Sequence, residues 1–431
     1  MSSDDKANLQ LSRRRFLTRS GLAAAAGIGL SAQGTPENTQ KPNPAVPESP
    51  GPLTEPFWGK HQGGILTPAQ RHTYFAALDL VATAREDVVE MLRKWTATSA
   101  RLSSGQPAGP IGSDTSIPAA DSAETLELPA ARLTLTFGFG AGLFIKDGQD
   151  RYGLAAKRPE ALVDLPKFNG DQLLESRTGG DILVQACADD PQVAFHAVRQ
   201  LLRQTYDVAE LRWVQSGFLA SGAPKETPRN LMGFKDGTNN ASDDQTMNKS
   251  IWVGDEGPDW MRGGSYVVVR RIRMALEHWD RMNVDFQEKT IGRCKYSGAP
   301  LGGKAEFDKP DYDATDKDGN PVIPEGSHMR LAAPVNNDGA QMLRRPYSYN
   351  DGASQTAERW PPWRQEMEYD AGLLFICYQK DPRTSFIKVF DRMAKLDTLN
   401  QFVTHTGGGL FACQGGMAEG EFIGQKLFES K

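Results

Sequence analysis

The chain has 431 residues, of which 39% are hydrophobic and 24% are charged, and its formal net charge at pH 7 is -5. This composition is typical of an ordinary globular protein that is long enough for more than one structural unit. Because the chain has no excess of basic residues to neutralise phosphates, we do not expect it to bind nucleic acid.

The first 32 residues are typical of an export signal. Residues 12–17, SRRRFL, fit the twin-arginine (Tat) pattern, and an apolar run of small residues follows from Gly21 to Leu30. That run is too short to cross a bilayer as a helix, as expected for the apolar part of a signal peptide. We therefore expect residues 1–32 to be a Tat signal that uses the Tat translocase and is cleaved near Ala32. The protein would then work in the periplasm or outside the cell. An exposed basic tail before a short helix is the alternative.

The folded part is expected to begin near residue 57, after a flexible lead rich in Pro and Gln at residues 33–56. An apolar run at residues 72–82 predicts a strand, and apolar residues with helical spacing predict a helix over residues 85–95. Residues 103–129, rich in Gly, Pro and Ser, are expected to form a loop.

Two segments that lie 191 residues apart (381 - 190 = 191) share one pattern. In residues 182–202 and again in residues 373–393, an apolar strand-like run leads through Asp-Pro to an amphipathic segment. Asp suits a helix N-cap, and Pro suits the first helical position. An internal duplication explains the pattern, although strand–Asp-Pro–helix is also a common local arrangement. Since strands and helices do not alternate regularly, the sequence favours an α+β fold over a doubly wound parallel sheet.

The cysteines and the acidic loop give weaker signals. The chain has no C-x-x-C or C-x-x-C-H motif, which disfavours a zinc ribbon or covalently attached haem. An exported protein can form disulfides, but Cys187 and Cys377 lie in apolar runs where buried free thiols are expected. Residues 308–324 contain five Asp residues but only a fragment of a calcium-loop pattern, so a solvated surface loop is expected.

A carboxylate between two glycines marks the most informative segment, residues 230–240 (NLMGFKDGTNN). Gly233 and Gly237 can adopt φ values that other residues avoid, and they let the backbone approach a flat ligand closely. Asp236 between them is a candidate general acid–base. An Asp-Gly turn with no chemical role is the alternative.

One histidine and one arginine downstream have a more specific context than the others. Any of six histidines could offer a neutral imidazole to a metal, and spacing does not select among them; they are His61, His72, His196, His278, His328 and His405. His196 lies on an amphipathic segment and is expected to pack there. His328 follows a Pro-Glu-Gly-Ser turn and leads into an apolar segment, and Arg344 opens an Arg-Arg-Pro-Tyr run. A guanidinium keeps its charge at any relevant pH.

Together these segments resemble the dye-decolourising haem peroxidases, most closely their exported deferrochelatase/peroxidase branch. The resemblance rests on residues 230–240, Ser327–Arg330 and Leu343–Arg345, and it extends from about residue 57 to the C-terminus. It implies an α+β fold of two ferredoxin-like halves, residues 57–225 and residues 226–431, with antiparallel sheets and peripheral helices. It also implies one non-covalent haem b, held mainly by the C-terminal half.

The resemblance assigns roles to individual residues. His328 becomes the axial ligand of the haem iron, Asp236 the distal acid–base, and Arg344 the charge that stabilises the departing oxygen. Asp397 falls where the family places a carboxylate that accepts a hydrogen bond from the axial histidine, and a helix-capping role is the equal alternative. Further haem contacts are expected from Gly237, Thr238, Asn239, Ala333, Pro334, Val335, Leu373 and Phe375.

The chain departs from the family pattern after the axial histidine. The family usually has Asn-Pro-Arg there, whereas this chain has Ala333, Pro334 and Val335. The missing arginine is expected to remove a contact to a haem propionate. Arg345 is expected to be a propionate partner or a surface residue.

The resemblance implies a peroxidase that reduces hydrogen peroxide and oxidises organic donors such as dyes, phenols or porphyrinogens through a ferryl intermediate. The alternative is a deferrochelatase that serves an iron-permease system and releases iron from haem with the porphyrin intact. A binding module does not need a distal acid and arginine, so their presence favours catalysis. Whether the chain forms a homodimer stays open.

Overall fold

The computed structural model describes residues 53–112, 114–220, 226–240, 244–355 and 367–429. The predicted signal peptide and most of the predicted lead lie outside the described residues. Residues 51–431 form a single unit by their internal contacts. None of the described helices is both long enough and apolar enough to cross a membrane.

The N-terminal half contains a four-stranded antiparallel sheet with the strand order β2-β3-β1-β4. Helix α3 packs on β1 and β3, and α1 packs against α3. Asp190 accepts hydrogen bonds from the first turn of α3, which Pro191 begins, as the Asp-Pro pair predicts. The elements are β1 (His72–Leu80), α1 (Arg85–Ser103), β2 (Thr134–Phe139), α2 (Ala141–Phe144), η1 (Ala155–Lys157), η2 (Glu175–Arg177), β3 (Ile182–Ala188), α3 (Pro191–Leu202) and β4 (Ala209–Phe218).

The C-terminal half repeats this arrangement with the antiparallel order β7-β8-β5-β9. A short strand, β6, also pairs with β8, and two residues separate the end of β6 from the start of β7. The elements are α4 (Asp244–Ser250), η3 (Asp259–Met261), β5 (Ser265–Met274), α5 (Leu276–Trp279), α6 (Val284–Ile291), α7 (His328–Ala332), η4 (Pro334–Asn336), β6 (Leu343–Arg344), β7 (Tyr347–Ser354), β8 (Glu368–Gln379), α8 (Phe386–Leu396), η5 (Thr398–Gln401), β9 (Val403–Cys413) and α9 (Gln425–Glu429).

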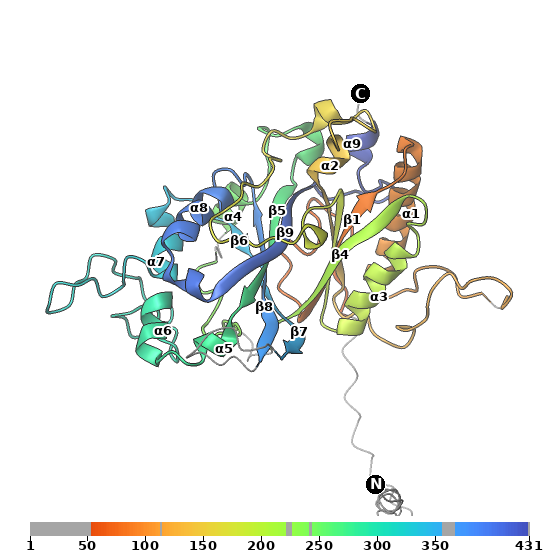
Figure 1. Ribbon diagram of the computed structural model, residues 1–431. Helices are drawn as coiled ribbons and strands as arrows, with labels where there is room; N and C mark the ends of the chain where they lie inside the picture. The colour runs from red at the N-terminus through yellow and green to blue at the C-terminus, as the bar shows by residue number, and fades with distance from the viewer. Residues whose placement is uncertain (1–52, 113, 221–225, 241–243, 356–366, 430–431) are drawn as a thin grey trace, which may run out of the picture. The chain divides into compact units, whose positions relative to one another are not determined.

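Both halves therefore order their four strands as second, third, first and fourth, which is the ferredoxin-like arrangement that the family resemblance implies. The two sheets meet at both edges. Phe218 of β4 pairs with Ser348 of β7, and Phe139 of β2 pairs with Ala412 of β9. The eight strands of the two sheets thus form a closed ring, and Figure 1 shows α1 and α3 on one side of the strands and α7 and α8 on the other.

Strand alternation divides the side chains of β8 between two environments. Leu374, Ile376 and Tyr378 are fully buried in the core between the two sheets. Leu373 and Phe375 point to the opposite face, where α7 and α8 lie beyond a cavity. The packed inner core holds the sheet rigid, so the residues on its outer face have fixed positions.

The second copy of the repeat differs from the prediction at its helix. Asp381 does not cap α8, which begins four residues after Pro382 with Ser385 at its N-cap. The Asp381 carboxylate instead accepts from the backbone and side chain of Arg383, so it closes a separate turn. All four cysteines are free thiols, as predicted for Cys187 and Cys377. The acidic loop is largely exposed, and Asp316 accepts hydrogen bonds from its own turn.

Candidate functional site

A cavity of about 240 Å³ lies between the outer face of the C-terminal sheet and the helices α7 and α8. Its walls are largely apolar, and its ionisable groups stand on separate elements. Strands β5 and β8, helix α8, the start of α7 and residues 230–240 all contribute to it. The polar residues that line it include Asp236, Asn239, Arg293, His328, Arg344, Asp397 and His405.

His328 is the first residue of α7, and its Nδ1 lies 2.7 Å from Oδ2 of Asp397. The turn before it is fixed because the buried Ser327 hydroxyl donates to the Pro324 carbonyl at 2.7 Å. With Nδ1 engaged by a carboxylate, Nε2 is the ring nitrogen that His328 offers to a ligand in the cavity.

Asp397 fulfils both of the roles that the sequence left open. Its Oδ2 holds His328, while its Oδ1 accepts from the backbone N–H of Leu399 at 2.8 Å and so caps η5. The Asp397 side chain is 3% exposed. Burial lowers the pKa of His328, but attraction to Asp397 and the hydrogen bond to it outweigh burial, so this pKa lies above its ordinary value.

Residues 230–240 form a compact loop that presents Asp236 to the cavity. Asn230 accepts hydrogen bonds from the N–H groups of Met232 and Phe234 through its side chain, which closes the first turn. Gly233 has φ +87° and Gly237 has φ +127°, so both positions need the conformational freedom of glycine. Asp236 is anchored by its own N–H, which donates to the Pro228 carbonyl at 2.8 Å.

Arg344 lies beside Asp236, with 3.4 Å between Nη1 and Oδ1. Asn240 holds this pair in register because its side chain donates to the Arg344 carbonyl at 2.7 Å and accepts from the Arg344 N–H at 3.1 Å. The two side chains are 28% and 19% exposed, so their charges remain accessible from the cavity. Both charges are close enough to His328 to influence its pKa.

Several predicted contacts lie on the cavity wall and two do not. Gly237, Thr238, Asn239, Pro334, Leu373 and Phe375 all line it. Ala333 is buried beside Asn337, which donates to its carbonyl, and Val335 is 74% exposed. Neither of these two residues lines the cavity in the described structure, where the 3₁₀ turn η4 directs Pro334 towards it.

Arg345 also departs from expectation. It is 6% exposed, and its guanidinium donates to the carbonyl of Thr67 and to the side chain of Gln70 in the N-terminal half. Consecutive residues of an extended chain point to opposite sides. Arg344 therefore faces the cavity, whereas Arg345 joins the two halves.

The sequence did not identify the polar group on the strand side of the cavity. The Arg270 Nε donates to Nδ1 of His405 at 3.2 Å, and Arg270 also pairs with the buried Asp171. Burial, with the Arg270 charge as a smaller cause, holds the pKa of His405 well below its ordinary value. His405 is thus neutral, and with Nδ1 accepting, its Nε2–H is a donor. The one available signal was an isolated histidine in a strand-like run.

The apolar walls follow helix and strand periodicity. Residues Phe386, Val389, Phe390 and Met393 of α8 recur at intervals of three and four, so they share one face of the helix. Ile272 and Met274 of β5 alternate in the same way as Leu373 and Phe375 of β8. Together they make two facing apolar walls, which suit a flat and mostly apolar ligand.

Comparisons with known proteins match most of the part of the chain that the structure describes. Residues 62–219 match the N-terminal domain of Dyp-type peroxidases, and residues 227–418 match the C-terminal domain. The chain is 37% identical to a dye-decolorizing peroxidase of Thermobifida fusca, with 100% of each chain covered. It is 36% identical to a deferrochelatase of Escherichia coli, with 96% of each covered. The crystal structure of a DyP-type peroxidase from Streptomyces coelicolor is 42% identical, with a TM-score of 0.78 over 88% of this chain and 98% of that one.

Proposed function

The chain belongs to the Dyp-type peroxidase family, and from its cavity we propose which residues carry out the peroxidase reaction. The protein is a haem-dependent oxidoreductase that uses peroxide. The observation that carries the proposal is the arrangement of two pairs in one cavity. His328 with Asp397 offers a ligand nitrogen, and Asp236 with Arg344 offers a proton carrier beside a fixed positive charge.

The residues present fit haem. An imidazole whose other nitrogen is held by a carboxylate is the usual form of a metal-binding histidine, since the carboxylate fixes the ring and makes it a stronger donor. The apolar walls from α8, β5 and β8 suit the porphyrin faces. We propose that His328 would ligate the haem iron and that Gly237, Thr238 and Asn239, which line the same cavity, would contact the haem. When bound, haem supplies an iron centre that peroxide oxidises by two electrons and that organic donors reduce in two one-electron steps.

The distal residues then have separate tasks. The Asp236 carboxylate takes a proton from one oxygen of hydrogen peroxide and returns it to the other, so that the departing oxygen leaves as water. Arg344 orients the peroxide and stabilises the negative charge that grows on the departing oxygen. Asn240 keeps the loop and the strand at the spacing that both tasks need.

The test is the absorption spectrum of the haem-loaded protein before and after peroxide, together with turnover of a dye or a phenol. Wild-type protein should oxidise the donor with hydrogen peroxide, and the Asp236→Asn and Arg344→Ala variants should bind haem but oxidise the donor slowly. Turnover at the wild-type rate in both variants would overturn the assignment of these roles.

Iron release from haem is the second candidate activity, because relatives at 34% to 36% identity are named deferrochelatases. Such an activity would use His328 to bind haem and would pass iron to a permease. Incubation with haem under reducing conditions separates the two activities. A deferrochelatase yields metal-free porphyrin and free iron, whereas a peroxidase leaves haem intact until peroxide is added.

We also propose that the protein is exported by the Tat pathway to the periplasm or beyond, which residues 12–17 support. A substitution of both Arg13 and Arg14 by lysine should keep the full-length chain in the cytoplasm. If this variant were exported as well as the wild type, the proposed route would be wrong.

A further inference from the structure

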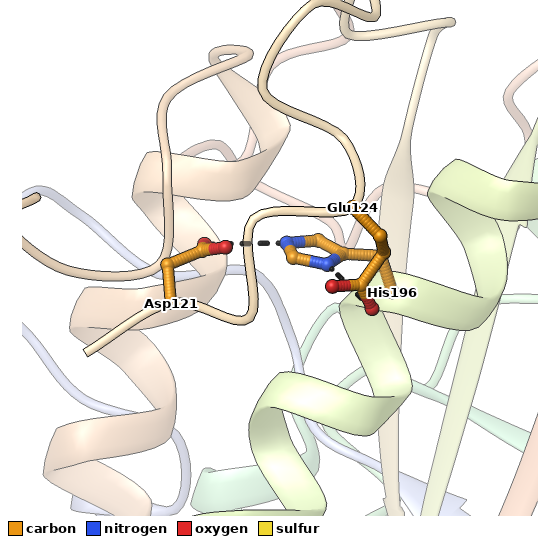
Figure 2. A group of neighbouring side chains, drawn as sticks. All are labelled: Asp121, Glu124 and His196. Carbon is orange, nitrogen blue, oxygen red and sulfur yellow. Dashed lines mark ion pairs between the residues drawn. The ribbon is translucent and has the colours of Figure 1, made fainter. Parts of the chain in front are cut away.

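A second group of ionisable side chains lies in the N-terminal half, away from the haem cavity. Asp121 and Glu124 stand on the loop between α1 and β2, and His196 projects from α3 towards both (Figure 2). One ligand atom from each of the three residues can be chosen so that all three atoms lie within 4.8 Å of one another. We call these three residues the loop–helix cluster.

Two atoms of the loop–helix cluster are buried without a hydrogen-bond partner. His196 is 1% exposed, and its Nε2 makes no hydrogen bond although it lies 3.3 Å from Oδ2 of Asp121. Oε2 of Glu124 is likewise buried without a partner. Leaving such atoms unsatisfied is costly, so each points to something that would complete it.

The remaining atoms of the cluster are already held in place. Asp121 accepts at 2.6 Å from the backbone N–H of Ala108 and again at 2.6 Å from that of Ala123. Glu124 places Oε1 3.0 Å from Nδ1 of His196 and 3.0 Å from Arg199. The cluster is therefore oriented before any ligand arrives, with its two partnerless atoms left free.

The charge of the cluster also calls for a cation. The two carboxylates bring two negative charges into a largely buried place, and Arg199, whose side chain is 47% exposed, is the cation paired with Glu124 in the described structure. Buried carboxylates of this kind need a further positive charge.

We propose that the loop–helix cluster binds one divalent cation of the Zn²⁺ class through His196 Nε2, Asp121 and Glu124 Oε2. Adjacent ligands on a tetrahedral ion with bonds of about 2.1 Å lie about 3.4 Å apart. The separation of 3.3 Å between His196 Nε2 and Asp121, without hydrogen-bond geometry, agrees with this spacing. An imidazole with two carboxylates suits zinc better than calcium or magnesium, which prefer oxygen ligands alone. The ion would fasten the long loop to α3.

The test is a calorimetric titration of the haem-loaded, chelator-treated protein with Zn²⁺ alone. Wild type should show one saturable site per chain. Asp121→Asn and Glu124→Gln preserve side-chain shape but remove the charged ligands, and each should weaken binding by about tenfold or more. The control is His278→Gln on α5, an exposed histidine outside the cluster, which should bind as the wild type does.

Zinc-edge X-ray absorption makes the result independent of variant folding. The bound ion should show one imidazole and further oxygen ligands at about 2.0–2.1 Å. No saturable binding, equal affinity in all variants, or sulfur at about 2.3 Å would overturn the proposal.

Discussion

The two halves of the molecule share one strand order but use the space beneath their main helix differently. In the N-terminal half, α3 packs directly on β1 and β3, and Val193, Ala197, Val198 and Leu201 complete the core. In the C-terminal half, the equivalent helix α8 packs mainly against α7, and its apolar face looks into the cavity. The same arrangement of strands and helices thus encloses a filled core in one half and a cavity in the other. The difference depends on whether the helix packs on the sheet, as α3 does, or on another helix, as α8 does.

The largest expected effect is the loss of haem from the C-terminal half when the His328 side chain is removed. His328→Ala removes the proposed ligand and should abolish the Soret band of the purified protein. His278→Ala is the matched control and should keep a normal spectrum, since this residue lies outside the cavity. Full haem occupancy with an unchanged spectrum in His328→Ala would contradict the proposed difference between the halves.

Loss of a distal group should slow the reaction with peroxide while leaving haem bound. Asp236→Asn removes the proton carrier and should reduce the rate by about a hundredfold to ten-thousandfold. Arg344→Ala removes the stabilising charge and should cost about a hundredfold to a thousandfold. Stopped-flow absorbance measures these rates, with the exposed Arg262→Ala variant as a control. Wild-type rates in both distal variants would sink the mechanism.

Removal of haem should loosen one half only. A bound ligand at a hundred times its Kd adds about 2.7 kcal/mol to the free energy of unfolding, and the apoprotein loses this contribution. Hydrogen exchange should therefore rise in α7, α8 and residues 230–240 of the apoprotein, because these segments enclose the cavity. Exchange in α3 and β1 should hardly change. Equal loosening of both halves would show that the cavity is not a local feature.

The Asp397 carboxylate should contribute a smaller amount to haem affinity. Asp397→Asn leaves a hydrogen-bond acceptor near His328 but removes its charge, and we expect haem affinity to fall by about tenfold to a hundredfold. Titration of the apoprotein with haem measures the change. Loss of the η5 cap could lower stability as well, so the unfolding midpoint must be recorded beside it.

The smallest expected effect is on stability and concerns the loop–helix cluster in the N-terminal half. Burial raises the pKa of Glu124, but hydrogen bonds, including those from Ser122, His196 and Arg199, outweigh this and lower it to about 2. A carboxyl whose pKa is depressed by folding stabilises the protein above its ordinary pKa. That contribution disappears as pH falls through the depressed value. Thermal unfolding in the presence of a chelator should show Glu124→Gln less stable than wild type at pH 6, with the gap closing towards pH 2. A gap that stays constant with pH would refute this account.

Several features of the two halves could be predicted from the sequence, because the signals for them lie in short segments of the chain. The Asp-Pro repeat predicted duplicated strand–helix units, and the glycines around Asp236 predicted a tight turn; both are present in the described structure. The position of Asp397 beside His328 came from the family resemblance, and the contact lies in the described structure.

What the sequence could not predict depends on distant pairings. His196 was expected only to pack on its helix. The sequence did not show its contacts with Asp121 and Glu124, because these residues lie on a loop more than 70 residues earlier in the chain. Arg345 was expected near a propionate or the surface, but the closed ring brings Gln70 of the other half to it. His405 carried no distinctive context until β5 placed Arg270 beside it. In each case a residue acquires its role from a partner that only the folded sheets supply.

The closed ring of strands has a consequence for how the protein is made. Strand β9 pairs along its length with β5 and reaches β2 through Ala412 and Phe139, which are 273 residues apart (412 - 139 = 273). Contacts between such distant residues slow folding, because a long segment of chain must be confined before the contact forms. The apolar inner faces of both sheets are buried in one shared core, to which Ile65, Ile251 and Trp252 also contribute. A ribosome-bound chain that lacks β9 therefore exposes both faces. The haem cavity cannot be completed until the chain from β8 to His405 of β9 has been synthesised.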